Sequence, residues 1–309
     1  MKYLSLLILS ILISTSCSQQ LKDENSYTRQ GWNENVILYG DIESITISGY
    51  DVTDKFGELI KNLKRQVIYK FNEHGDVYEI SMYNEKGELK RKILNKYDSN
   101  NNLLEELRYL NNGLLSQKQV FSYDSKRNIT EKILYNENNY IIERFVYKYS
   151  SNGYLEESAE YDEFGLYGKI ILRYDLEGKI AERGFYNDKG IMTNKIMCKY
   201  NTNSKLIEEF LYSDNGEIEE KHFYSYNEKS LLVEEKYCKK DDSISEVLLY
   251  KYDQNDKVCE ILYCDENMVV REKEIYKRDN KGNIIETITY DSGAMIPRWL
   301  VERIIKYRQ

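Results

Sequence analysis

Proline is nearly absent from this chain, with one residue in 309, and histidine is almost as rare, with two. Every residue other than proline keeps its backbone N–H, so long strand ladders can form with little interruption. His74 and His222 cannot supply a multi-histidine metal centre, and neither stands in a recognised metal-ligand spacing. We therefore expect no metal, no cofactor, and both histidines at the surface.

An excess of basic residues is also missing. The chain has 44 Lys and Arg against 52 Asp and Glu, a net charge of −8, and no basic run. Proteins that bind the phosphate backbone need clustered positive charge, so nucleic acid is excluded as a partner. Phosphate-binding loops, dinucleotide fingerprints and nucleophile elbows are absent as well. The sequence thus predicts a protein that is not an enzyme.

The N-terminal segment that ends at Cys17 has the organisation of a lipoprotein signal. A basic start, Met1-Lys2, precedes an apolar run from Leu4 to Ile13 that is too short to span a bilayer. Ser14-Thr15-Ser16-Cys17 resembles a lipobox, although the family pattern has Leu, Val or Ile where Ser14 stands. We predict a signal peptide at 1–16, a lipid on Cys17 and a polar tether over 17–34. The alternative is an ordinary signal peptide with an incidental cysteine.

This interpretation predicts that the protein lies in the cell envelope and is anchored to a membrane by its lipid. The outer membrane is favoured, and the protein is exposed either to the periplasm or at the cell surface. The remaining cysteines fit no metal motif and have no obvious pairing partners. We expect them to be buried as small hydrophobic side chains; they are Cys198, Cys238, Cys259 and Cys264.

Thirty tyrosines reveal an internal repeat. Aromatic residues recur with a 26-residue period from Phe71 to Tyr252, apart from one step that is a single residue shorter, and Arg278 takes the next slot. A second tyrosine lies about midway in each unit, and each aromatic precedes turn-forming residues such as Asn84-Glu85-Lys86-Gly87. That pattern is typical of a three-residue hairpin loop whose last residue is left-handed, and it would place Tyr83 opposite Leu89. Each unit is therefore predicted to be a β-hairpin.

In all nine units, the residue six positions after the first aromatic is apolar, and the residue eight positions after it is glutamate. Period-2 alternation would put both on the face that the aromatics occupy. On this register tyrosine hydroxyls of the preceding strand would satisfy the carboxylates, for example Tyr147 beside Glu157 and Tyr250 beside Glu260. We interpret this glutamate ladder as structural and keep open a periodic surface for Ca²⁺ or a repeating ligand. Its members are Glu79, Glu105, Glu131, Glu157, Glu182, Glu208, Glu234, Glu260 and Glu286.

The predicted fold is all-β: a long antiparallel meander of hairpin repeats over 71–290, with capping strands in 35–70 and 291–309. Strand twist accumulates along so many strands that the sheet must coil, split or close, and we expect a twisted or coiled, solenoid-like spiral. A membrane-spanning barrel is disfavoured because neither face offers a continuous uncharged band.

Tyr-x-Tyr-Asp cores such as Tyr147-Lys148-Tyr149 and Tyr250-Lys251-Tyr252-Asp253 resemble the YD repeats of the RHS family over about residues 69–293. That resemblance implies a spiralling shell and, for short members, a surface protein linked to carbohydrate binding or cell contact. We therefore expect a non-enzymatic envelope lipoprotein that acts as a binding or scaffold module for glycan or protein. The alternatives are a hydrolase that uses ladder carboxylates and a structural spacer.

Overall fold

The computed structural model describes Gln30 and residues 36–309, so the predicted signal peptide, Cys17 and most of the tether lie outside the described residues. Twenty β-strands account for its regular structure. They are β1 Ile42–Lys55, β2 Glu58–Phe71, β3 Val77–Asn84, β4 Leu89–Tyr97, β5 Leu103–Leu110, β6 Leu115–Tyr123, β7 Ile129–Asn136, β8 Ile141–Tyr149, β9 Leu155–Asp162, β10 Gly165–Tyr174, β11 Ile180–Asn187, β12 Met192–Tyr200, β13 Leu206–Ser213, β14 Ile218–Tyr226, β15 Leu232–Lys239, β16 Ile244–Tyr252, β17 Val258–Cys264, β18 Val270–Arg278, β19 Ile284–Asp291 and β20 Trp299–Tyr307.

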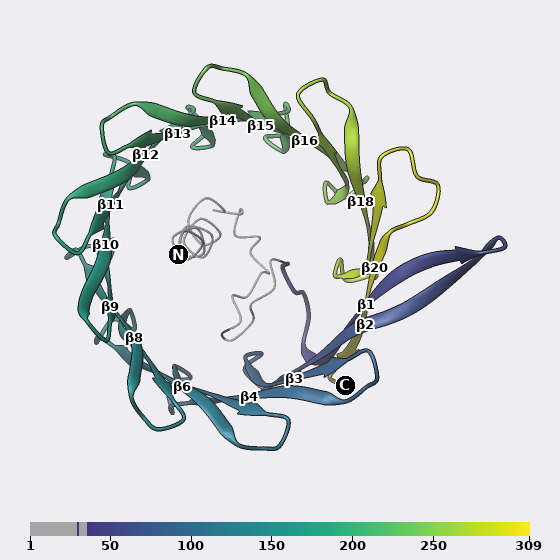
Figure 1. Ribbon diagram of the computed structural model, residues 1–309, viewed down its shortest axis with the longest axis horizontal. Coiled ribbons are helices and arrows are strands. Elements are labelled where there is room, and N and C mark those ends of the chain that lie inside the picture. Colours follow the sequence, from purple (N-terminus) through teal and green to yellow (C-terminus); the bar gives the residue numbers. More distant parts are fainter. Residues whose placement is uncertain (1–29, 31–35) are drawn as a thin grey trace.

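Each strand pairs antiparallel with the next, which confirms the all-β meander. β1 also pairs with β20, from Ile42 opposite Tyr307 to Asp51 opposite Trp299, so the sheet closes into a barrel (Figure 1). The predicted spiral or solenoid is therefore wrong, and so is the resemblance to the YD repeats of the RHS family, which implied a spiralling shell as well. The reason is that strand twist can be absorbed by closure as well as by coiling, and the two non-repeating terminal segments decide between them.

The turns have the predicted geometry. The backbone N–H of Asn84 donates to the Glu88 carbonyl at 3.1 Å, Gly87 adopts a φ of 75°, and Tyr83 lies opposite Leu89. Asn101, Arg127 and other non-glycine residues take the same left-handed position elsewhere. Asx-type side-chain bonds stabilise these turns, since Asp98 accepts from the backbone N–H groups of Asn100 and Asn102.

A β-bulge follows each of these turns and reverses the side-chain phase. Lys96 lies opposite Glu105 but Tyr97 lies opposite Leu103, so Leu104 is skipped. Tyr97 and Leu103 therefore face one side of the wall, while Glu105 faces the other. The prediction that the aromatics, the apolar residues and the glutamates share a face is wrong for this reason.

The side of the wall that carries the first aromatic of each unit faces the lumen, and midway tyrosines such as Tyr109 lie on the outer side. Residues 36–41 enter β1 from inside the ring (Figure 1), and Leu38 packs there with Ile42, Ile45, Tyr69 and Ile80 in the main buried cluster. The first tyrosine of each repeat donates a hydrogen bond from its hydroxyl to a backbone carbonyl of the preceding repeat. The acceptor is the apolar residue six positions after that repeat's own first aromatic, as when Tyr123 donates to Leu103 at 2.8 Å. Further clamps of this kind are formed by Tyr97, Tyr149, Tyr174, Tyr200, Tyr226 and Tyr252, and Arg278 replaces the tyrosine in the last unit.

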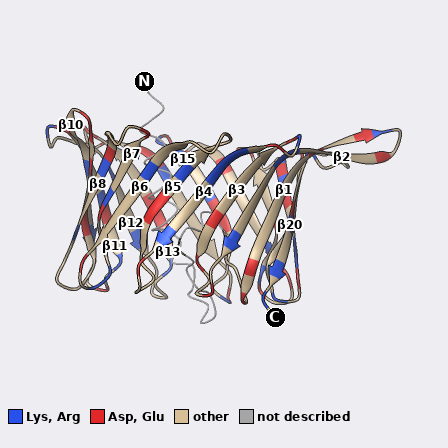
Figure 2. Ribbon diagram, turned by 90° about the horizontal axis from the view of Figure 1, so that it is seen from below, with Lys and Arg blue, Asp and Glu red and all other residues tan. Residues whose placement is uncertain are grey.

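Charged residues occur along the whole length of the strands (Figure 2), and the pairing places many of them on the outer side, above and below an apolar level. On β5, for example, Leu107 is flanked by Glu105 and Tyr109, which lie opposite Lys96 and Lys92 of β4. On β5 the single apolar side chain spans about 7 Å of the outer wall, whereas a lipid-facing barrel wall needs about 25 Å of apolar surface. Within the described residues, no helix is long and apolar enough to cross a membrane.

The barrel has two rims that differ in their connections. We call the connections that follow odd-numbered strands the upper rim and those that follow even-numbered strands the lower rim. Past Asp51 and Arg65, β1 and β2 pair only with each other, and residues 52–64 project from the upper rim as a hairpin that we call the arm (Figures 1 and 2). Gln30 lies at the lower rim, where its backbone N–H donates to Asp76.

Candidate ligand site in the lumen

The glutamate ladder lies on the outer wall, where lysine and arginine side chains bind it. Lys148 and Lys169 contact the two oxygens of Glu157 at 2.7 and 3.2 Å. Burial alone raises the pKa of the Glu79 carboxyl, but hydrogen bonds from Lys92 and Lys70 more than offset this and hold it below its usual range. Similar ion pairs are formed by Glu105, Glu131, Glu182, Glu208, Glu260 and Glu286.

The predicted tyrosine partners of the ladder are wrong. Tyr147 lies opposite Ser158, whereas Glu157 lies opposite Lys148, because the bulge shifts the register by one residue. A Ca²⁺ ion at the ladder would have to displace these lysines. Among residues 30 and 36–309, no group of three or more His, Cys, Asp or Glu side chains is placed to hold a metal.

Tyrosine–carboxylate contacts do occur, but in the lumen and with other glutamates. Tyr250 and Tyr237 both donate to Glu235, each at 2.6 Å, through its two different oxygens. Burial, followed by the charge and hydrogen bond of Glu235, raises the pKa of the Tyr250 hydroxyl far above its usual value. Tyr224 donates to Glu209 at 2.7 Å, and Tyr263 and Tyr276 donate to Glu274. The inner wall from β13 to β18 is therefore lined by phenols and carboxylates.

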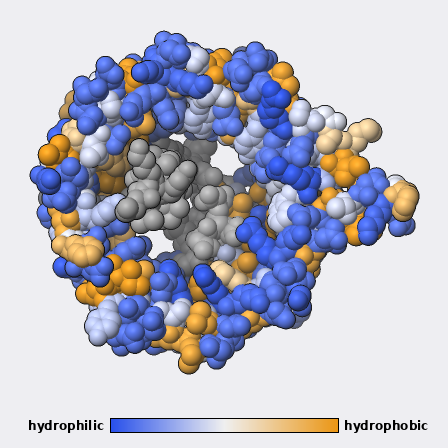
Figure 3. Space-filling view, viewed as in Figure 1, coloured by the Kyte–Doolittle hydropathy of each residue, from blue (hydrophilic) through white to orange (hydrophobic). Residues whose placement is uncertain are grey.

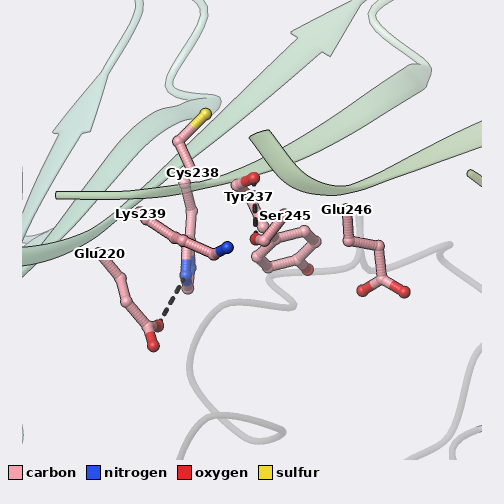
Figure 4. A pocket seen from close by; sticks show the side chains of 7 residues that line it. Glu220, Tyr237, Cys238, Lys239, Ser245 and Glu246 are labelled. Carbon is pink, nitrogen blue, oxygen red and sulfur yellow. Dashed lines mark hydrogen bonds and ion pairs between the residues drawn. The ribbon is translucent and has the colours of Figure 1, made fainter. Parts of the chain in front are cut away.

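A cavity of about 290 Å³ opens in this wall just below the upper rim (Figure 4). Glu220, Tyr237 and Glu246 point to one side of the sheet and Cys238 to the other (Figure 4). His222 also lines the cavity, packs edge-on against Tyr237 with ring centroids 4.5 Å apart, and lies 3.4 Å from Glu220. The expectation that His222 is a plain surface residue is wrong, since a lumen is invisible until the ring closes.

A larger cavity, of about 680 Å³, lies where β18, β19 and β20 meet β2 and β3, and we call it the seam pocket. Its lining includes Trp299, Tyr276, Thr287, Thr289, Glu274 and the guanidinium groups of Arg65 and Arg303. Arg303 donates to the Thr287 hydroxyl at 3.0 Å, which fixes two of the polar groups relative to each other. Aromatic faces beside hydroxyl, carboxylate and guanidinium groups thus converge on one space.

Gly49 on β1 makes room for the aromatic wall of the seam pocket. A β-carbon at position 49 would come within 2.7 Å of a Trp299 ring carbon, closer than such contacts occur, and 3.5 Å from the Arg65 side chain. The indole therefore packs directly on backbone. Gly49, Arg65 and Trp299 lie outside the repeat array, whereas Glu274, Tyr276, Thr287 and Thr289 belong to it. Sequence reasoning did not bring these residues together; the signal available was the concentration of Trp299 and Pro297 in the segment that departs from the repeat.

The four cysteines within the described residues form no disulfide; Cys198, Cys238 and Cys264 are buried as expected, while Cys259 is half-buried. The Cys198 thiol lies 3.5 Å from a Glu209 oxygen.

Comparisons with known proteins give little guidance on function. A family model described as an uncharacterised protein matches residues 118–217, and no curated protein matches. The chain is similar to a porin-like protein from Bacteroides uniformis, with 10% identity over 86% of this chain and 98% of that chain and a TM-score of 0.39. It is also similar to a Photorhabdus luminescens Tc holotoxin pore, with 12% identity over 88% of this chain and 19% of that chain and a TM-score of 0.24. Closure of the barrel rests on the strand pairing, and a barrel is compatible with an outer-membrane or envelope location.

Proposed function

We propose that this protein is a non-enzymatic, lipid-anchored binding protein of the cell envelope that holds a saccharide in the seam pocket. The observation that carries the proposal is the lining of that pocket, where Trp299 and Tyr276 stand beside Thr287, Thr289 and Glu274. Aromatic faces pack against the C–H faces of sugar rings, while hydroxyl and carboxylate groups bond to sugar hydroxyls. A volume of about 680 Å³ lies within the range of small-ligand sites.

A hydrolase that uses the ladder carboxylates is supported less well. A general acid needs a pKa raised toward neutrality, whereas lysines lower the pKa of Glu79 and Glu157. The ladder also repeats nearly the same environment in each unit, which gives no pair of carboxylates with opposite roles. A pure spacer gives no reason for Arg65 and Trp299, which lie outside the repeat array, to meet at one cavity.

Soluble protein comprising residues 18–309 is expected to bind one class of glycan on an array, and Trp299→Ala should weaken that binding about tenfold or more. Phe56→Ala is the matched control, because Phe56 is an exposed aromatic at the tip of the arm and far from the lumen. Thermal unfolding of each variant separates lost binding from lost structure. Glycan binding that survives Trp299→Ala in a folded protein would move the site elsewhere, and a blank array would remove the saccharide proposal.

The anchor is tested independently of the ligand. Cys17→Ser is expected to move the full-length protein from the membrane fraction to the soluble fraction and to abolish incorporation of labelled fatty acid, because the lipid chains supply the stable attachment. Cys259→Ser, at a half-buried cysteine in the wall, serves as the control. Unchanged fractionation and labelling of the Cys17 variant would disprove the anchor.

A further inference from the structure

Exposed large apolar side chains are concentrated at one end of the barrel. Eighteen such residues are exposed in the described chain, and thirteen of them lie in or beside the connections of the upper rim. Counted in the same way, the lower rim has four, namely Tyr78, Leu104, Tyr154 and Leu176. Scattered apolar residues need no explanation, but a bias to one face indicates a contact surface.

These side chains are distributed among the connections rather than gathered in one patch. Seven of the ten upper connections present at least one; six of these residues are Phe56, Leu114, Tyr140, Phe164, Ile191 and Met295. Met268 lies on a seventh. In Figure 3, which looks onto this rim, hydrophobic patches alternate with hydrophilic surface around the ring and reappear at the end of the arm.

The tip of the arm also carries an exposed apolar side chain, although its backbone conformation disfavours one. Phe56 and Gly57 form its two-residue turn, with φ values of 57° and 89°. Asn, Asp and Gly are the usual residues at such positions, because a left-handed backbone disfavours a β-carbon. Phe56 is fully exposed and gains no packing in return. An external contact of its ring would account for its presence.

A flat lipid surface fits this arrangement better than a protein partner does. Apolar tips spaced around a closed rim can all reach one plane, as interfacial side chains of membrane-surface proteins do. The chain between Cys17 and Gln30 is thirteen residues long and can extend about 45 Å. A wall of eight- or nine-residue strands is about 30 Å tall, so the anchor can reach a bilayer at either rim, and the apolar tips decide which.

The negative charge of the upper rim favours contact with zwitterionic rather than anionic lipid. The ten upper connections carry eleven carboxylates and four basic side chains, a net charge of −7. Such a rim is repelled by an anionic surface and tolerated by a zwitterionic one.

We propose that the upper rim, together with the tip of the arm, docks on a bilayer of zwitterionic lipid, so that the barrel stands on the membrane with its lower mouth facing away. This orientation rests on the proposed envelope location but not on the lipid on Cys17. It places the arm along the membrane and leaves the lower mouth as the open route to the seam pocket.

The test is flotation of soluble residues 18–309 with vesicles of phosphatidylcholine. Wild-type protein is expected to float with the vesicles, and replacing a minor part of the lipid by phosphatidylglycerol should reduce the bound fraction. The combined variant Phe56→Ser, Leu114→Ser, Phe164→Ser is expected to bind at least about a hundredfold more weakly, at roughly fivefold for each apolar side chain withdrawn from the interface. Because all three side chains are exposed, the substitutions leave the barrel intact.

Leu176→Ser with Tyr154→Ser is the matched control, since these apolar residues belong to the lower rim. Retained flotation of this variant supports the orientation. An equal loss in both variants, no flotation of the wild type, stronger binding to the anionic vesicles, or self-association of the wild type that the triple variant abolishes would each overturn the proposal. Because the protein used lacks Cys17 and no glycan is present, failure here is distinct from failure of the anchor or of the saccharide site.

Discussion

A chain that ends at Ile296 is expected to lose cooperative unfolding and to aggregate, although it keeps all the hairpin repeats. The truncation removes β20, which joins β1 on one side and β19 on the other. Without it the ring opens, two strand edges are exposed, and the buried cluster loses Val301, Ile305 and Tyr307. An open spiral would lose a single terminal interface and remain folded. Near-ultraviolet circular dichroism and urea titration measure the difference.

A single substitution in β20 tests the same junction between β19, β20 and β1. Leu300→Pro removes a ladder bond in a buried position that lies opposite both Tyr50 and Ile288, so we expect a loss of several kcal/mol in the free energy of unfolding. Thr53→Pro is the matched control, because Thr53 lies in the arm and pairs only with Ile60. Its effect on global unfolding should stay below about 1 kcal/mol. If the truncated chain unfolds as cooperatively as the full chain, closure does not determine stability.

Asn283→Ala is expected to destabilise the protein by about 3 kcal/mol, the largest effect of any single polar substitution that we foresee. Asn283 is completely buried. Its side chain accepts from the Tyr39 N–H at 2.7 Å and donates to the Tyr39 carbonyl at 2.9 Å and the Tyr307 hydroxyl at 2.6 Å. Replacing this side chain by alanine removes all three hydrogen bonds at a buried position and releases the segment that leads into β1.

Asn128→Ala provides the comparison, because Asn128 occupies the equivalent slot of another repeat. Its amide donates only to Asp124 within its own turn, at 2.9 Å, so its removal should cost about 1 kcal/mol or less. Urea unfolding of the two variants gives the contrast directly. Equal losses would mean that Asn283 serves its turn and not the junction between the two ends of the chain.

Local structure was predictable here because short-range chemistry specifies it. The regular spacing of the aromatics, the left-handed residue at Gly87 and the pairing of Tyr83 with Leu89 all follow from residues within one hairpin. The face of the glutamate ladder was not predictable in this way. A single skipped residue, such as Leu104, reverses the phase of alternation, and no residue type marks that position across the units.

The sequence by itself determined the composition of this protein in hairpins: how many repeats, where each turns, and that neighbours pair antiparallel. Only the tertiary structure decided that β1 meets β20, because that pairing joins the two ends of the described chain and no local pattern encodes it. Closure in turn creates an inside and an outside. It converts Glu235 and His222 into lumenal groups, and it brings Gly49, Arg65 and Trp299 together at the seam, where the fold stops repeating and a specific site can form.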